Sequence, residues 1–107
     1  MDDVFNMDPQ ALRQMLERGE KVFLLDCREP WEHNMARIDG ATLIPMREIS
    51  ASVERIPRDC PVVVFCHFGQ RSLAVALWMR EAGIEARSLS GGIDRWAAEI
   101  DNDIPRY

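Results

Sequence analysis

Cys66 begins a short turn whose residue types could make its thiol reactive. The turn reads Cys66, His67, Phe68, Gly69, Gln70, Arg71 and Ser72. A thiolate is the reactive form of cysteine, so a functional cysteine needs surroundings that favour negative charge. A helix that begins near Ser72 would supply unpaired amides and partial positive charge, and Gly69 would let the turn curl into a nest of amides. With the permanent charge of Arg71 beside it, Cys66 is expected to be a nucleophile.

The same cysteine also fits a purely structural role. A free cysteine often behaves as a small apolar core residue, and Cys66 ends an apolar run at 62–65. The glycine, the arginine and the serine that follow it favour the catalytic interpretation. His67 has two interpretations as well: its ring could assist the thiolate or contact a substrate, or it could face solvent while only its backbone amide matters.

The elements that position this turn follow from the alternation of apolar with amphipathic segments. Short apolar segments, which we expect to be strands, lie at 4–7, 21–27, 41–45, 61–66 and 85–90. Helical spacing runs from Asp8-Pro9 to Gly19, from Met46 to Ile56, from Ser72 onward and from Ile93 to Ile100. This alternation predicts an α/β fold with a mainly parallel sheet, and ligands bind such sheets beyond the carboxyl ends of the strands. Cys66 falls at such an end.

Further polar and sulfur-bearing residues share that edge of the expected sheet. Asp26 and Arg28 lie at the carboxyl end of the second strand segment, where paired charges would fix local geometry. Cys27 lies between them and could form a disulfide with Cys66 under oxidation, although a small buried residue at a strand end is the simpler interpretation. Cys60 precedes the next strand segment and is expected to be remote from the site.

The bulk composition limits the class of protein. A chain of 107 residues with 47% hydrophobic residues and a net charge of -5 fits one soluble globular domain and argues against binding to nucleic acid. The acidic start, MDDVFNMDPQ, predicts neither a signal peptide nor a membrane anchor. The three cysteines have no metal-ligand spacing, so we expect reduced thiols in a cytoplasmic protein without a metal or a membrane partner. The tryptophans Trp31, Trp78 and Trp96 are expected to pack in the core.

Three long segments carry a resemblance to a known family. They are LDCREPWEHNMARIDGATLIP, VVVFCHFGQRS and LSGGIDRWAAEIDNDIPRY. In this order they look like the landmark segments of the rhodanese family. The resemblance covers essentially the whole chain and implies a single rhodanese domain at 1–107. Its fold would have three layers, with a parallel five-stranded sheet flanked by helices on both faces.

The resemblance also implies an activity and roles for residues. Cys66 would take a sulfane sulfur from a donor such as thiosulfate or a persulfide, hold it as a persulfide, and pass it to cyanide or a thiol. The amides of residues 67–72 would stabilise the anionic persulfide, and Arg71 would help to hold an anionic donor. The donor and the acceptor could be small molecules or partner proteins, and no cofactor is expected. The residues Asp26, Arg28 and Glu32 form a D-x-R-x-x-x-E pattern that would brace the site.

Two other functions remain open at this point. The turn resembles the cysteine phosphatase signature, but four residues rather than five separate Cys66 from Arg71. A smaller ring of amides suits a single sulfur better than a phosphoryl group, so a phosphatase or arsenate reductase is the less favoured alternative. A carrier module that accepts sulfur from a partner protein would need the same cysteine. One departure from the family is Ala36-Arg37, where many members have Gly-His, and it puts any role of that histidine in doubt.

Overall fold

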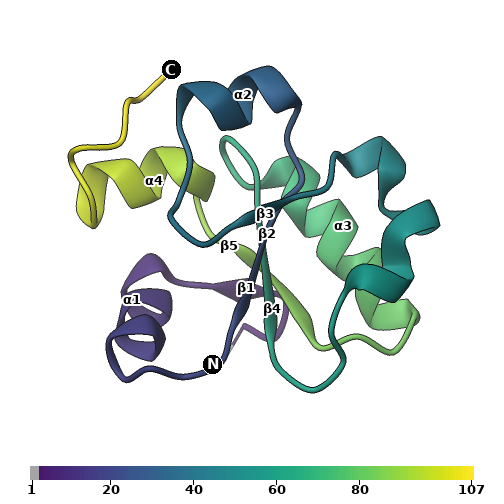
Figure 1. Cartoon of the computed structure of the whole chain (residues 1–107). Coiled ribbons are helices and arrows are strands. Elements are labelled where there is room, and N and C mark those ends of the chain that lie inside the picture. Colours follow the sequence, from purple (N-terminus) through teal and green to yellow (C-terminus); the bar gives the residue numbers. More distant parts are fainter. Residues whose placement is uncertain (1–2) are drawn as a thin grey trace.

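A computed structural model describes residues 3–107, and within that range five parallel strands form one sheet (Figure 1). The strands are β1 (Asn6–Met7), β2 (Phe23–Asp26), β3 (Thr42–Leu43), β4 (Val62–Phe65) and β5 (Ala86–Leu89). Their spatial order is β1-β5-β4-β2-β3, which puts β4 at the centre. The predicted α/β fold with a parallel five-stranded sheet is therefore confirmed. The prediction that the chain starts without a signal peptide includes Met1 and Asp2, which lie outside the described residues.

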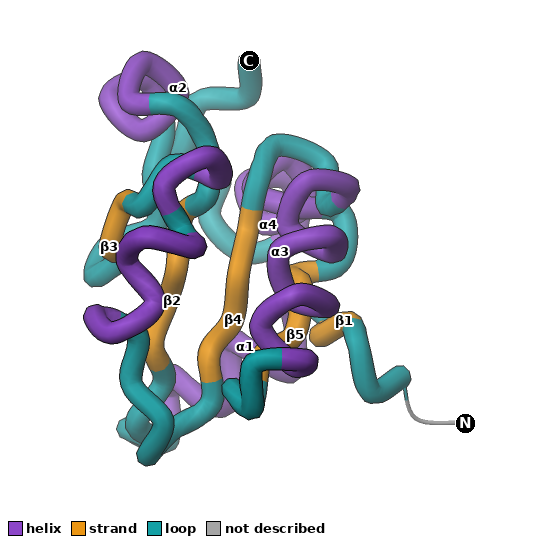
Figure 2. The backbone as a smooth tube through the Cα atoms, turned by 90° about the vertical axis from the view of Figure 1, so that its right-hand side faces the viewer, coloured by secondary structure: helices purple, strands orange, loops and turns teal. Residues whose placement is uncertain are grey.

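Helices cover both faces of the sheet. They are α1 (Pro9–Glu17), α2 (Pro30–Met35), α3 (Gln70–Glu81) and α4 (Gly92–Glu99), with the 3-10 helices η1 (Met46–Glu48) and η2 (Ser50–Arg55). Figure 1 shows α1 and α4 on one side of the sheet and α3 on the other. Figure 2 looks onto the face that α3 and the two 3-10 helices cover. None of the helices within residues 3–107 is long and apolar enough to cross a bilayer.

The central strand, β4, shows no alternation of apolar and polar residues in its sequence. Every residue of β4 is buried, because its side chains enter a separate apolar core on each face. Val62 and Val64 pack with Met79 of α3 on one face. Val63 and Phe65 contribute to the core that includes residues of α1 and α4 on the other face. A strand fixed on both sides holds the residue that follows it, Cys66, in a defined place.

One local prediction was wrong, and one short helix was not predicted. The segment from Met46 to Ile56 is not one α-helix, because its backbone bonds run between residues three apart, as in Ile49 N to Met46 O and Ile56 N to Val53 O. The apolar residues Met46, Ile49, Val53 and Ile56 are three, four and three positions apart, and the two steps of three fit either helix type, so the pattern alone did not separate them. The helix α2 was not predicted, since a six-residue helix carries no apolar period. It begins at Pro30 and is stabilised by a capping box between Glu29 and Glu32.

The tryptophans differ from the expectation of core packing. Trp96 is buried in the core beneath α4. Trp31 is 59% exposed and Trp78 is 40% exposed, so the prediction was wrong for both. Trp31 lies on α2 and Trp78 on α3, and each leaves a large part of its ring open to solvent. Trp31 contacts the ring of Tyr107 edge-on, with centroids 5.9 Å apart.

Candidate active site

Cys66 directly follows β4, and its side chain is buried under the turn that leads into α3. Two backbone amides point at its Sγ atom: the N–H of Gly69 donates at 3.1 Å and that of Ser72 at 3.3 Å. Gly69 has φ +108°, a backbone conformation that L side chains rarely adopt. Ser72 belongs to the first turn of α3, where amides lack partners within the helix. The turn therefore presents hydrogen-bond donors to the sulfur.

Two buried serines extend this arrangement. The Ser72 hydroxyl lies 3.3 Å from Cys66 Sγ, and the Ser88 hydroxyl of β5 lies 2.7 Å from that of Ser72. The Ser88 hydroxyl also donates to the carbonyl oxygen of Gly69 at 3.4 Å. Both serines are fully buried. Because hydroxyls rotate, Ser72 can accept a bond from a thiol or donate one to a thiolate.

The outer side of the turn is fixed by α4. The amide of Ile93 donates to the carbonyl oxygen of Cys66 at 2.9 Å, and that of Asp94 donates to the carbonyl oxygen of His67 at 3.1 Å. At Gly92 a Cβ atom would lie 2.3 Å from the His67 oxygen, which is far closer than any allowed contact. These bonds hold the carbonyls of the turn outward, so its amides are free to face the sulfur.

Arg71 lies on the first turn of α3 and is paired with Glu32 of α2. Its Nη1 and Nη2 atoms donate to the two carboxylate oxygens of Glu32 at 2.8 and 2.9 Å. The Glu32 side chain is 5% exposed and that of Arg71 is 38% exposed. The guanidinium is the main reason why the pKa of Glu32 falls to about 2. Arg71 therefore lies at the site in an ion pair with Glu32. Its contact with an anionic donor stays a prediction.

Asp26 and Arg28 form the buried ion pair that the sequence predicted. The Nε and Nη2 atoms of Arg28 donate to the two oxygens of Asp26 at 2.8 and 2.7 Å, and both side chains are fully buried. Nη1 of Arg28 donates to the Tyr107 hydroxyl at 2.8 Å, which in turn donates to Glu32 at 2.7 Å. Tyr107 thus joins the Asp26–Arg28 pair to the Glu32–Arg71 pair.

Aromatic rings stack beside the turn. The His67 ring lies between Phe68 and Tyr107, with centroids 3.9 and 3.8 Å away and nearly parallel planes. Among the described residues, Nε2 of His67 is buried and has no hydrogen-bond partner. Phe68 and Gln70 are exposed. Their backbones help to shape the turn. The amides of residues 67–72 were expected to face the sulfur, and those of Gly69 and Ser72 lie within hydrogen-bond distance of Sγ.

The three cysteines differ in their surroundings. All are free thiols, and each is buried. Cys27 follows β2 as Cys66 follows β4, and these strands are paired in register at Asp26 and Phe65, so the two thiols are neighbours across the sheet. Burial and the nearby Cys66 raise the pKa of Cys27 to about 12. Cys60 lies before β4, at the end of the strand opposite Cys66, as the sequence predicted.

Three contributors to the site were missed at the sequence level: Tyr107, Ser88 and Gly92. Tyr107 stands 75 positions from Glu32, and no spacing pattern links them. Ser88 faces the site because it lies on β5 beside β4, where it pairs with Val64. In the sequence, Gly91 and Gly92 only precede the helical spacing that runs from Ile93 to Ile100. A pair of glycines before a helix can also mark a close contact that leaves no room for a side chain, and Gly92 makes such a contact with the turn.

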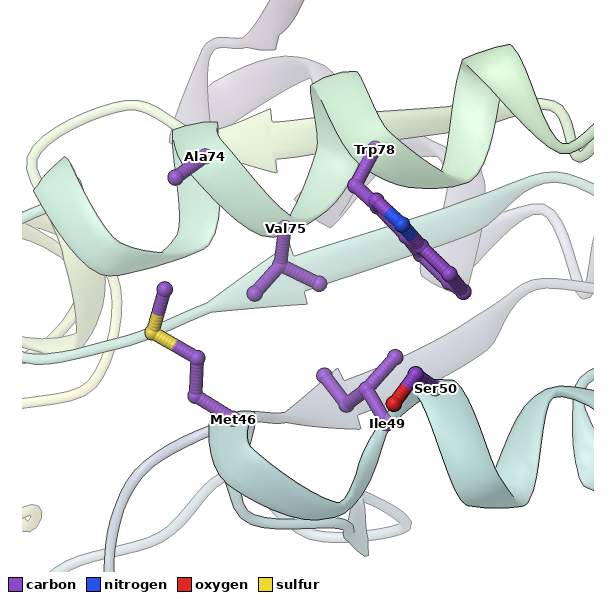
Figure 3. A pocket seen from close by; sticks show the side chains of 6 residues that line it. All are labelled: Met46, Ile49, Ser50, Ala74, Val75 and Trp78. Atoms are coloured by element: carbon purple, nitrogen blue, oxygen red, sulfur yellow. The ribbon is translucent and has the colours of Figure 1, made fainter.

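An apolar groove lies on the face covered by α3. It has a volume of about 220 Å³ and is lined by Met46, Ile49, Ser50, Ala74, Val75 and Trp78. Figure 3 shows these side chains between α3 and the two 3-10 helices. No residue of the turn from Cys66 to Ser72 lines it, so the groove is separate from the sulfur-facing amides.

Comparison with known proteins shows the family to which this fold belongs. The family model described as "Rhodanese-like domain" matches residues 8–99. The chain belongs to the rhodanese-like domain family. Its α/β fold with a parallel five-stranded sheet is thus that of a rhodanese-like domain, as the three sequence segments implied.

Relatives of similar length are named sulfurtransferases. A sulfurtransferase of Allochromatium vinosum is 35% identical over 95 residues, which cover 88% of this chain and 89% of the relative. The thiosulfate sulfurtransferase GlpE of Pseudomonas aeruginosa is 30% identical over 105 residues, covering 96% of this chain and 94% of GlpE. These relatives support a rhodanese-like sulfurtransferase.

Other matches extend the family in length and in structure. The probable adenylyltransferase/sulfurtransferase MoeZ of Mycobacterium tuberculosis is 36% identical over 102 residues, but these cover 92% of this chain and only 26% of MoeZ. The chain therefore spans about a quarter of that relative. The crystal structure of a rhodanese-like domain protein from Staphylococcus aureus matches with a TM-score of 0.84 at 25% identity, covering 96% of this chain and 98% of the other.

Proposed function

We propose that this rhodanese-like domain, residues 1–107 acting as one unit, transfers sulfane sulfur through a persulfide on Cys66. The observation that carries the proposal is the convergence of the Gly69 and Ser72 amides on Cys66 Sγ, at 3.1 and 3.3 Å. Donors fixed in advance around a buried sulfur stabilise the anionic form in which it attacks and the anionic persulfide that results. The Ser72 hydroxyl supports both states.

The reaction has two transfers of the same kind. In the first, the Cys66 thiolate attacks the outer sulfur of the donor, the donor's sulfur–sulfur bond breaks, and the leaving group departs with its electron pair. Thiosulfate would leave sulfite, and a thiol persulfide would leave a thiolate. In the second, a thiolate or cyanide attacks the terminal sulfur of the Cys66 persulfide. The bond to Sγ breaks, and Cys66 is released as a thiolate for the next cycle.

Intact-mass measurement of loaded protein tests this proposal directly. Wild type incubated with thiosulfate or an alkyl persulfide should gain the mass of one sulfur atom, and added cyanide should remove it as thiocyanate. Cys66→Ser protein should gain nothing. Cys60→Ser is the matched control, since that buried thiol lies at the far end of β4, and it should load as wild type does. If no donor adds sulfur to the wild type, or if Cys66→Ser still loads, the proposal fails.

Phosphatase chemistry is the alternative that uses the same thiolate. The structure gives it little support, because Arg71, which would have to bind phosphoryl oxygens, already donates two hydrogen bonds to Glu32. The comparison assay is hydrolysis of an aryl phosphate by wild type and Cys66→Ser protein. Turnover that is lost with Cys66 would establish the phosphatase and overturn sulfur transfer as the main activity.

A further inference from the structure

The charge of Arg71 at the active-site turn is neutralised by a carboxylate that is held in place. Besides both bonds from Arg71, Glu32 accepts the hydroxyl of Tyr107 at 2.7 Å and the amide of Glu29 at 3.0 Å. The Glu32 side chain is 5% exposed. A buried carboxylate with four donors has no freedom to turn away when a ligand arrives. Arg71 therefore cannot present its full charge to an incoming anion.

The neighbouring arginines are neutralised in the same way. Arg28 is paired with the buried Asp26. Arg47 donates to both oxygens of Glu29, the residue that caps α2. Arg106 donates to both oxygens of Asp94, whose amide bonds the carbonyl of His67. Each cation in this network of contacts has a carboxylate partner, so the network brings no net positive charge to the turn.

Aromatic side chains make up part of the exposed surface beside the turn, together with the polar Gln70 and the partly exposed Arg71. Phe68 is 55% exposed, and its ring covers one face of His67, whose other face is covered by Tyr107. Trp31, which is 59% exposed, contacts the other side of this stack. Cys66 itself is only 1% exposed. A donor must therefore bring its sulfur to a buried thiol that lies beside these aromatic rings.

We propose that Glu32 is a specificity-determining residue which, by neutralising Arg71, favours donors that are thiol persulfides with an uncharged stem and disfavours the dianion thiosulfate. This inference rests on the proposed function. In the favoured step, the Cys66 thiolate attacks the outer sulfur of R–S–SH. The sulfur–sulfur bond of the donor breaks, R–S⁻ leaves with the electron pair, and the outer sulfur, now on Cys66, keeps its proton until the persulfide ionises to the anion that the amides stabilise. Glu32 acts through Arg71 and touches no reacting atom.

A series of charge variants tests the inference. Rate constants for loading Cys66 are measured by intact mass with thiosulfate and with hydroxyethyl persulfide. Glu32→Gln leaves one net positive charge at the turn, Arg71→Gln leaves one net negative charge, and the double variant restores neutrality. The control Asp59→Asn also removes one negative charge, but its ion pair with Lys21 lies before β4, at the opposite end of the sheet.

The expected result is a change in donor preference. Glu32→Gln should load from thiosulfate about tenfold faster than wild type, because an unscreened guanidinium attracts the dianion, while loading from hydroxyethyl persulfide changes little. The gain should shrink as salt is added. Arg71→Gln should slow thiosulfate far more than the persulfide, and the double variant should return to the wild-type ratio. Asp59→Asn should leave the ratio unchanged. A persulfide on an uncharged cysteine peptide is measured beside hydroxyethyl persulfide. The comparison shows whether a peptide donor or a small-molecule donor loads Cys66 faster.

The outcomes separate the inference from the function on which it rests. If neither donor loads wild-type Cys66, the proposed function fails. If both load but the ratio of their rates is the same in wild type and in folded Glu32→Gln, the inference is overturned and sulfur transfer stands. If Glu32→Gln does not fold, Arg71→Gln and the double variant decide, and equal losses with both donors overturn the inference. A preference of the wild type for thiosulfate over hydroxyethyl persulfide also overturns it.

Discussion

The hydroxyl oxygen of Ser88 lies 2.7 Å from that of Ser72, and this contact ties β5 to the residue that faces Cys66 Sγ. Ser88 also bonds the carbonyl of Gly69, the other residue whose amide points at the sulfur. One buried hydroxyl on a neighbouring strand thus positions both donors.

Ser88→Ala should slow the chemistry of Cys66 without unfolding the protein. Loss of the hydrogen bond should cost about 1 kcal/mol of unfolding free energy and leave the Ser72 hydroxyl free to rotate away from Sγ. We expect slower alkylation of Cys66 by iodoacetamide at neutral pH. Ser90→Ala, just beyond the end of β5, is the control and should alkylate at the wild-type rate. Equal alkylation rates of Cys66 in Ser88→Ala and wild type would show that Ser88 does not affect the reactivity of the thiol.

Gly92→Ala should be strongly destabilising. A Cβ atom there would meet the carbonyls of His67 and Cys66 at 2.3 and 2.6 Å, and φ is +64°. We expect a loss of roughly 2–4 kcal/mol in urea unfolding, from overpacking together with the left-handed backbone. Gly40→Ala isolates the second effect, because Gly40 has φ +85° and nothing within 4 Å of the added atom. Its loss should be about 1 kcal/mol. Equal losses of unfolding free energy in Gly92→Ala and Gly40→Ala would mean that the contact between Gly92 and the turn can move apart to make room for the added methyl group.

Tyr107→Phe should weaken the network that holds Glu32. The change removes the hydroxyl that accepts from Arg28 and donates to Glu32, but it keeps a ring to stack on His67. Hydrogen bonds to charged groups are the stronger kind, so we expect a loss of roughly 2 kcal/mol in unfolding free energy. Tyr107→Ala, which also loses the stack, should lose more. If Phe and Ala cost the same, the stacked ring contributes nothing.

The stability of the protein should depend on Glu32 in acid. The pKa of Glu32 is lowered from 4.5 to about 2 in the folded protein, mainly by Arg71. Its contribution is therefore fully present above about pH 4.5 and is lost as pH falls toward 2. Other carboxylates titrate there as well, so the measurement compares unfolding free energy against pH in wild type and Glu32→Gln. The wild-type slope should be steeper below pH 4.5, and parallel curves would show that Glu32 is not held by its ion pair.

Cys27 should take no part in the reaction despite its place beside Cys66. With a pKa raised to about 12, it stays a protonated thiol, which is not a nucleophile. Cys27→Ala should therefore load sulfur on Cys66 at a rate within about twofold of wild type. Peptide mapping after brief alkylation should find the label on Cys66 and not on Cys27. A loading defect in Cys27→Ala, or a disulfide between the two thiols during turnover, would contradict this.

The sequence predicted those parts of the molecule that depend on local patterns. Apolar runs such as 61–66 marked the strands, and their alternation with helical segments was enough for a parallel sheet. The cysteine turn stood out because its residues are adjacent in the chain. Asp26 and Arg28 were expected to pair, since they are two positions apart at the end of a strand, and they do.

What the sequence did not predict depends on contacts between distant segments. The pairing of Glu32 with Arg71 spans 39 positions and needs α2, whose six residues have no helical period. Tyr107 reaches the site only because the segment after α4 returns to α2, as Figure 1 shows at the C terminus. The 3-10 helices were predicted as one α-helix because apolar residues three positions apart occur in both helix types.

The joint between Gly92 and the turn has a consequence for attempts to move this chemistry elsewhere. The amides of the turn face the sulfur because α4, which begins more than twenty positions later, binds the carbonyls of Cys66 and His67 from outside. A graft of the stretch from Cys66 to Ser72 onto another strand–helix unit would carry the reactive residue but not this outer support. A working transplant would have to include the Gly91-Gly92 segment as well, so the portable unit is two pieces of chain and not one.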